Sequence, residues 1–103
     1  MEFYDIQCLV YEEYKKNGYL SMWNSVTQGA FGNLAEMGLV TTEVGEALEA
    51  IRDNDRDELA LECADIVIRV LNFASRNRID LEKVILAKNE KNLTRGKNHG
   101  RDI

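Results

Sequence analysis

Apolar residues recur along this chain with the spacing of α-helices. Between residues 2 and 17 they follow the i, i+3, i+4, i+7 pattern of one helix face, and Asn17-Gly18 ends the segment. Residues 18–30 have no clear period and are expected to form a loop, with at most a short helical turn. Helical patterns return at about 31–52, from Asp55 to about 77, and at 81 to about 95, with Asp55 and Asp80 as N-caps. The pattern predicts an all-α fold, a bundle of four principal helices.

Composition agrees with a single all-α domain over residues 1–103. The chain is 45% hydrophobic and 30% charged and contains no proline, which suits a helical globular protein. Its net charge of −5 argues against a nucleic-acid partner, and no apolar run approaches the roughly 18 residues that span a membrane. The N-terminus lacks the shape of a signal peptide. Cys8 and Cys63 are expected to be reduced thiols in the core of a cytoplasmic protein.

The segment from Leu59 to Ala74 is apolar on almost every side. The polar residues of this segment form a single narrow stripe, which Arg76 continues beyond the segment. The residues of the stripe are Glu62, Asp65, Arg69, Asn72 and Arg76. A helix that is apolar on most sides is surrounded by protein, so the stripe faces either solvent or an internal polar site. This helix alone leaves both possibilities open. Three other helices of one small chain cannot cover it well, so we expect a homodimer.

The preceding helix favours an internal polar site. Glu36, Glu43 and Glu46 share one face and interrupt an apolar strip. Antiparallel packing across the short break would bring Glu43-x-x-Glu46 opposite Glu62-x-x-Asp65. Four carboxylates gathered among apolar neighbours repel one another, and a divalent cation would neutralise them. An all-oxygen set selects a hard ion such as Mg²⁺ or Mn²⁺.

The last helix carries the opposite charge. Lys88, Asn92 and Arg95 lie on one face near its C-terminal end. Basic residues at that end also complement the helix dipole, which alone would explain them. Beside four carboxylates and a metal ion, the same face suggests phosphate binding. A di-iron bundle is a weak alternative, because such bundles use Glu-x-x-His pairs and this chain has only His99, in its tail.

Together these motifs resemble the MazG-type, all-α nucleoside triphosphate pyrophosphohydrolases, from about residue 18 to 103. The stretch TTEVGEALEAIRD resembles the first metal motif of that family. The stretch DELALECADIVIRVLNFASRNRIDLEKVILAKNEKNLTRGKNHG resembles the second metal motif, the following helix and the basic tail. Many members have an acidic doublet at Thr42-Glu43 and Arg-Pro at Arg95-Gly96. Neither departure removes a presumed metal ligand.

The resemblance implies hydrolysis of a nucleoside or deoxynucleoside triphosphate to the monophosphate and pyrophosphate. Water would be the nucleophile, and Mg²⁺, or Mn²⁺ in its place, would be the cofactor. The catalytic residues and metal ligands would be Glu43, Glu46, Glu62 and Asp65. The substrate-binding residues would be Lys88, Asn92, Arg95 and Trp23. Trp23 would stack on the base, although a single tryptophan more often belongs to a core.

Several alternatives stay open. Arg69 and Asn72 lie further along the acidic stripe, where they would either contact substrate or pair with Glu36 or another carboxylate. Members of the family commonly form dimers or dimers of dimers, and we expect one of these states here. The function could also be that of a related pyrophosphohydrolase acting on a phosphoribosyl-nucleotide in histidine synthesis, or of a non-catalytic helical binding or assembly module. The intact set of four carboxylates argues against the last.

Overall fold

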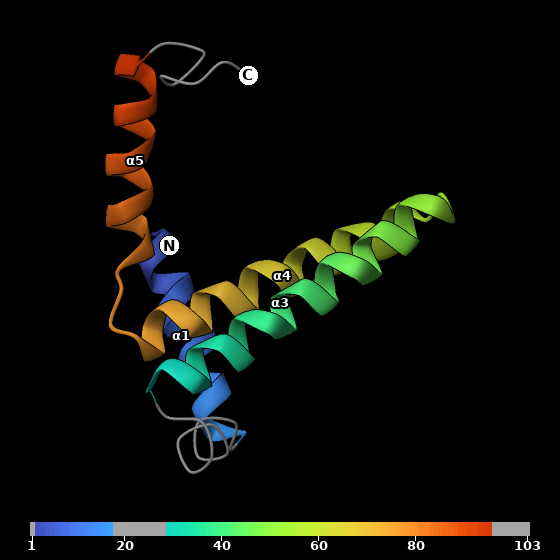
Figure 1. Cartoon of the computed structure of the whole chain (residues 1–103), viewed down its shortest axis with the longest axis horizontal. Coiled ribbons are helices and arrows are strands. Elements are labelled where there is room, and N and C mark those ends of the chain that lie inside the picture. Colours follow the sequence, from blue (N-terminus) through green and yellow to red (C-terminus); the bar gives the residue numbers. More distant parts are fainter. Residues whose placement is uncertain (1, 18–28, 96–103) are drawn as a thin grey trace.

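The computed structural model of this chain describes residues 2–17 and 29–95. These residues form four helices and no strand: α1 (Phe3–Lys16), α3 (Gly29–Arg52), α4 (Arg56–Arg76) and α5 (Leu81–Arg95), drawn in Figure 1. The all-α prediction is confirmed, and the helix bounds lie close to those expected. The loop expected at 18–30 is wrong for Gly29 and Ala30, which open α3, while residues 18–28 lie outside the described part.

Helices α3 and α4 form an antiparallel hairpin and lie side by side along most of their lengths (Figure 1). The turn between them places Asn54 in the left-handed region, with φ of 56°, a conformation that asparagine tolerates better than most residues. Asp55 then caps α4, since its side chain accepts a 3.0 Å hydrogen bond from the backbone N–H of Glu58. Buried Ala47 and Ala50 mark the face of α3 that packs on α4.

Helix α1 packs against α4 and also meets α5. Gln7 of α1 is almost completely buried at this junction. Its side-chain Nε2 donates to Ser75 Oγ at 3.0 Å and to the carbonyl oxygen of Ile79 at 2.8 Å, and its Oε1 accepts from the backbone N–H of Leu81 at 3.2 Å. One amide therefore joins α1 to the end of α4, the following turn and the start of α5. Asp80 caps α5 through the backbone N–H of Lys83, as expected.

Much apolar surface stays exposed in the single chain. Helix α5 extends away from the α3–α4 hairpin (Figure 1), and large apolar side chains are exposed on α4 and α5, among them Leu61, Val67, Leu86 and Leu93. Cys8 and Cys63 are free but exposed, so the prediction that they lie in the core is wrong. The reason is that each sits on a helix face that no other described helix covers. In the described part of the chain, no helix combines the length and hydropathy needed to cross a membrane.

Candidate metal centre

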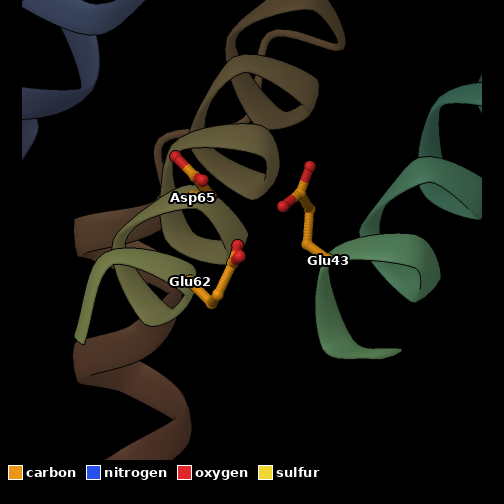
Figure 2. A group of neighbouring side chains, drawn as sticks. All are labelled: Glu43, Glu62 and Asp65. Carbon is orange, nitrogen blue, oxygen red and sulfur yellow. The ribbon is translucent and has the colours of Figure 1, made fainter. Parts of the chain in front are cut away.

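Three of the four predicted carboxylates come together between the arms of the hairpin. Glu43 projects from α3 toward Glu62 and Asp65 of α4, as Figure 2 shows. One carboxylate oxygen from each residue lies within 4.8 Å of the other two. Glu43 and Glu62 are buried, whereas Asp65 is exposed. The group is therefore anchored in the helix interface and opens to solvent on the side of Asp65.

Glu62 is the most perturbed member of this group. Its Oε1 atom is buried and has no hydrogen-bond partner among the residues that the structure describes. The pKa of Glu62 is raised to about 7, first by burial of the carboxyl group, then by a hydrogen bond with Glu58 and by the charge of Glu46. Glu46 thus acts on the cluster electrostatically, although it is exposed and does not belong to the group of three. A buried carboxylate oxygen without a donor is the kind of atom that a bound cation satisfies.

This donor set fits the metal expected from the sequence. All the ligand atoms are carboxylate oxygens, which suit Mg²⁺ or Mn²⁺ better than soft or strongly nitrogen-binding ions. Two of these candidate ligands come from residues one helical turn apart on α4, and the third comes from the facing helix. This arrangement depends on the register of the hairpin, which the polar residues further along α4 fix.

Those polar residues face α3, so the stripe on α4 lines an internal interface. Arg69 donates from Nε to Glu43 Oε1 at 2.9 Å, which resolves its pairing in favour of a carboxylate of the cluster. Arg76 donates from Nε to Glu36 Oε1 at 3.0 Å. Asn72, between these two pairs, is buried, and its Oδ1 has no hydrogen-bond partner within residues 2–17 and 29–95. The solvent-facing interpretation of the stripe is therefore wrong for Asn72 and Arg76, whereas the Arg69 side chain stays 41% exposed.

Sequence reasoning did not identify the network around Glu36. Tyr14 of α1 donates its hydroxyl to Glu36 Oε2 at 2.8 Å, and Arg76 Nη2 also donates to Asn33 Oδ1 at 2.7 Å. Burial and the hydrogen bond with Glu36 raise the pKa of Tyr14 well above its usual value. The signal that could have revealed this network is the recurrence of Glu36 seven residues before Glu43 on the same face of α3. The network holds α1 against the hairpin at the end away from the α3–α4 turn.

The described residues of the predicted cationic face do not lie beside the carboxylates of their own chain. Lys88 is exposed and Asn92 is half-buried, and both belong to α5, which extends away from the hairpin and contacts mainly α1. Arg95 ends α5, but its side chain lies outside the described part. Trp23 also lies outside the described residues. Among the described residues, the geometry thus brings together three of the four predicted carboxylates and leaves Lys88 and Asn92 apart from them.

Comparison with known families matches most of the chain to one family model. A family model described as the MazG nucleotide pyrophosphohydrolase domain matches residues 31–100, which include nearly all of α3 and the whole of α4 and α5. Searches among curated proteins and solved structures gave no match. Since the family match spans well over half of the chain and contains every carboxylate of the cluster, the protein belongs to the MazG nucleotide pyrophosphohydrolase family.

Proposed function

We propose that this protein hydrolyses a nucleoside or deoxynucleoside triphosphate to the monophosphate and pyrophosphate with Mg²⁺, or Mn²⁺ in its place. The observation that carries the proposal is the convergence of Glu43, Glu62 and Asp65 from two facing helices. In the described part of the chain, Oε1 of Glu62 is buried there without a hydrogen-bond partner. Membership of a nucleotide pyrophosphohydrolase family supports the reaction class. A non-catalytic assembly module would gain nothing from three mutually repelling carboxylates in an interface.

The four carboxylates have different roles in this proposal. Buried Glu43 and Glu62 would hold the ion from opposite helices, and Asp65 and Glu46 would complete its surroundings from the solvent side. When bound, the ion would neutralise phosphate charge and polarise the phosphorus under attack. Asp65 and Glu46 are exposed, and in this proposal either would accept a proton from the attacking water and pass it to solvent.

The basic half of the site would come from a second copy of the chain. A triphosphate carries more negative charge than one divalent ion neutralises, so further cations must meet it. Lys88, Asn92 and Arg95 would provide that contact, but α5 directs its described residues away from the hairpin of its own chain. A homodimer, or a dimer of dimers, would bring α5 to a neighbouring hairpin. It would also cover apolar residues exposed on α4 and α5.

A cytoplasmic location suits this proposal. The substrate would be an intracellular nucleotide, and Cys8 and Cys63 are both free thiols.

The decisive experiment is a substrate panel with product analysis. We would incubate the purified protein and Mg²⁺ with the common and the oxidatively damaged nucleoside and deoxynucleoside triphosphates, and with a phosphoribosyl-nucleotide. The expected products are pyrophosphate and a monophosphate, and a chelator should stop the reaction. Release of orthophosphate with a diphosphate would reject the proposed reaction. Turnover of the phosphoribosyl-nucleotide alone would favour the related pyrophosphohydrolase.

A further inference from the structure

Arg69 is the cation that directly contacts the carboxylate cluster in the described part of the chain. Its Nε donates to Glu43 Oε1 at 2.9 Å, and the Arg69 side chain is 41% exposed, whereas that of Glu43 is 11% exposed. The Nε edge of Arg69 therefore faces the carboxylate cluster, while much of the side chain is open to solvent. We propose that Arg69 binds the phosphate chain of the substrate while it holds Glu43 in position. This inference rests on the proposed function and assigns the site a further binding residue.

The hydrogen bonds of Arg69 leave most of its binding capacity free. A guanidinium offers five N–H donors in a planar fork, and Arg69 uses only Nε. Among the described residues, its Nη1 and Nη2 have no hydrogen-bond partner. These terminal nitrogens are the atoms that bind phosphate oxygens in a bidentate manner. Arg69 is thus able to bond the carboxylate through one nitrogen and an anion through the others.

A second arginine on the same stripe shows what a purely structural role looks like. Arg76 is only 9% exposed, and it donates from Nε to Glu36 and from Nη2 to Asn33. Its donors on both edges of the guanidinium are occupied by the protein. Arg69 differs in exposure and in its free terminal nitrogens, although both residues pair with a glutamate of α3. A structural counter-ion for Glu43 alone would not need that open edge.

The negative charge of the cluster and of the substrate gives the terminal nitrogens of Arg69 a function. Three carboxylates lie within 4.8 Å of one another, so an approaching triphosphate meets strong repulsion until cations offset it. A bound divalent ion supplies part of that compensation, and Arg69 adds a positive charge on the same rim. Lys88 belongs to the separate helix α5, so among the described residues of the same chain Arg69 is the cation nearest the cluster. Its position suits the phosphate groups better than the base, because the metal ligand Glu43 is its direct partner.

Binding measurements without turnover separate this role from a counter-ion role. We would titrate parent, Arg69→Gln, Arg69→Lys and the control Arg56→Gln with Mn²⁺ alone, and then with a non-hydrolysable α,β-imido nucleoside triphosphate at saturating Mn²⁺. Arg56 is exposed in the first turn of α4, away from the cluster. Arg69→Gln should weaken binding of the analogue by about tenfold or more, as expected for a lost charge-assisted contact. Binding of Mn²⁺ alone should be equal or tighter, because a competing cation is gone.

The remaining variants and outcomes complete the test. Arg69→Lys should bind the analogue with intermediate affinity, since it keeps the charge but lacks the fork. Circular dichroism would verify that each variant is folded. Analogue binding by Arg69→Gln within twofold of the parent would overturn the proposal and leave Arg69 as a counter-ion. A tenfold loss of Mn²⁺ binding would also overturn it, because Arg69 would then act only by positioning Glu43. A parent protein that binds neither ligand would instead reject the proposed function itself.

Discussion

Arg76 of α4 and Glu36 of α3 form an ion pair, with Nε 3.0 Å from Oε1, in which the two side chains are only 9% and 7% exposed. Tyr14 of α1 donates to the other oxygen of the same carboxylate, so the pair links three helices. Such a buried pair adds little net stability compared with apolar residues, but the loss of one partner leaves a buried charge uncompensated. Because Arg69 and Glu43 pair across the same interface, this contact also fixes the register that assembles the cluster.

Replacing Arg76 tests that relationship. Arg76→Met should lower the free energy of unfolding of the metal-free protein by about 3 kcal/mol, because the Glu36 carboxylate stays buried without its cation. Urea unfolding followed by circular dichroism would measure the loss. Lys15→Gln is the control, since Lys15 pairs with Glu12 at 3.0 Å on the surface of α1, and its loss should be under about 0.5 kcal/mol. Equal losses in both variants would show that the buried pair does not hold the hairpin.

Neutralising a single carboxylate should stop turnover without unfolding the protein. Asp65→Asn and Glu46→Gln should each lower kcat by at least about 100-fold, since even the outer partners of metal ligands commonly contribute about 10- to 100-fold. Helicity should stay unchanged, and the metal-free fold should keep or gain stability as repulsion falls. Glu49→Gln, an exposed charge on α3, is the matched control. If both site variants melt far below the parent, and Mg²⁺ does not protect the parent, these residues are structural.

The raised pKa of Glu62 predicts an unusual pH dependence for the metal-free protein. Its pKa is about 7 in the folded chain against an ordinary value of 4.5, so folding favours the neutral form. The stabilising contribution is complete below the ordinary pKa and is lost as pH rises through the folded value. In a chelator, Tm should therefore fall between about pH 5 and pH 8, and Glu62→Gln should flatten this change.

Added Mg²⁺ should act in the opposite direction, because it binds the ionised carboxylate. The rise in Tm caused by Mg²⁺ should be larger at about pH 8 than at about pH 6. Glu49→Gln serves again as a control and should keep the slope of the parent. The assignment to Glu62 fails if the slope in chelator survives unchanged in Glu62→Gln.

Replacing the cationic residues of α5 is the first step in testing whether α5 serves the site of another chain. Lys88→Ala and Arg95→Ala should each weaken triphosphate binding or turnover while leaving metal binding nearly unchanged. Lys83→Ala, on a different face of α5, should have no such effect. A pure helix-dipole role predicts only about 0.3–1 kcal/mol of stability and unchanged kinetics.

Mixing inactive variants is the second step. The acidic variant Asp65→Asn and the cationic variant Lys88→Ala should complement each other in a mixed dimer. If Asp65→Asn and Lys88→Ala chains exchange freely, half of the dimers are mixed, and one of the two sites in each is intact. Activity should then recover to roughly a quarter of the parent level. Strictly additive residual activities after verified subunit exchange would show that α5 does not complete a neighbouring site.

Local features of the fold could be predicted from the sequence because their causes are local. Periodic apolar positions set the helices, and Asp55 and Asp80 cap the helices that follow them. The approach of Glu43 to the second acidic motif followed from antiparallel packing alone. The pairing of Glu43 with Arg69 could not be predicted in the same way, because it depends on the register of the hairpin. That register depends on contacts such as the one between Arg76 and Glu36.

The structural features that the sequence did not predict share a non-local cause. Glutamine is a residue type that usually lies at the surface. The burial of Gln7 depends on groups around residues 75–81 that no local sequence pattern reveals. Cys8 and Cys63 lie in helical patterns among apolar residues, which predicts burial in the core, whereas this small chain leaves much of its apolar surface open. The direction of α5 depends on the short turn before it, in which Arg78 has φ of 59°.

The contacts of Gln7 also set an order of events during synthesis. Its partners lie 68, 72 and 74 residues further along the chain, so α1 leaves the ribosome long before they exist. At about 5–20 residues per second, translation of that interval takes roughly 4–14 s. The hairpin of α3 and α4, whose contacts are closer in sequence, can pair during this time. The contacts of Gln7 are therefore among the last to form, and a nascent chain halted before Leu81 holds an unfinished joint.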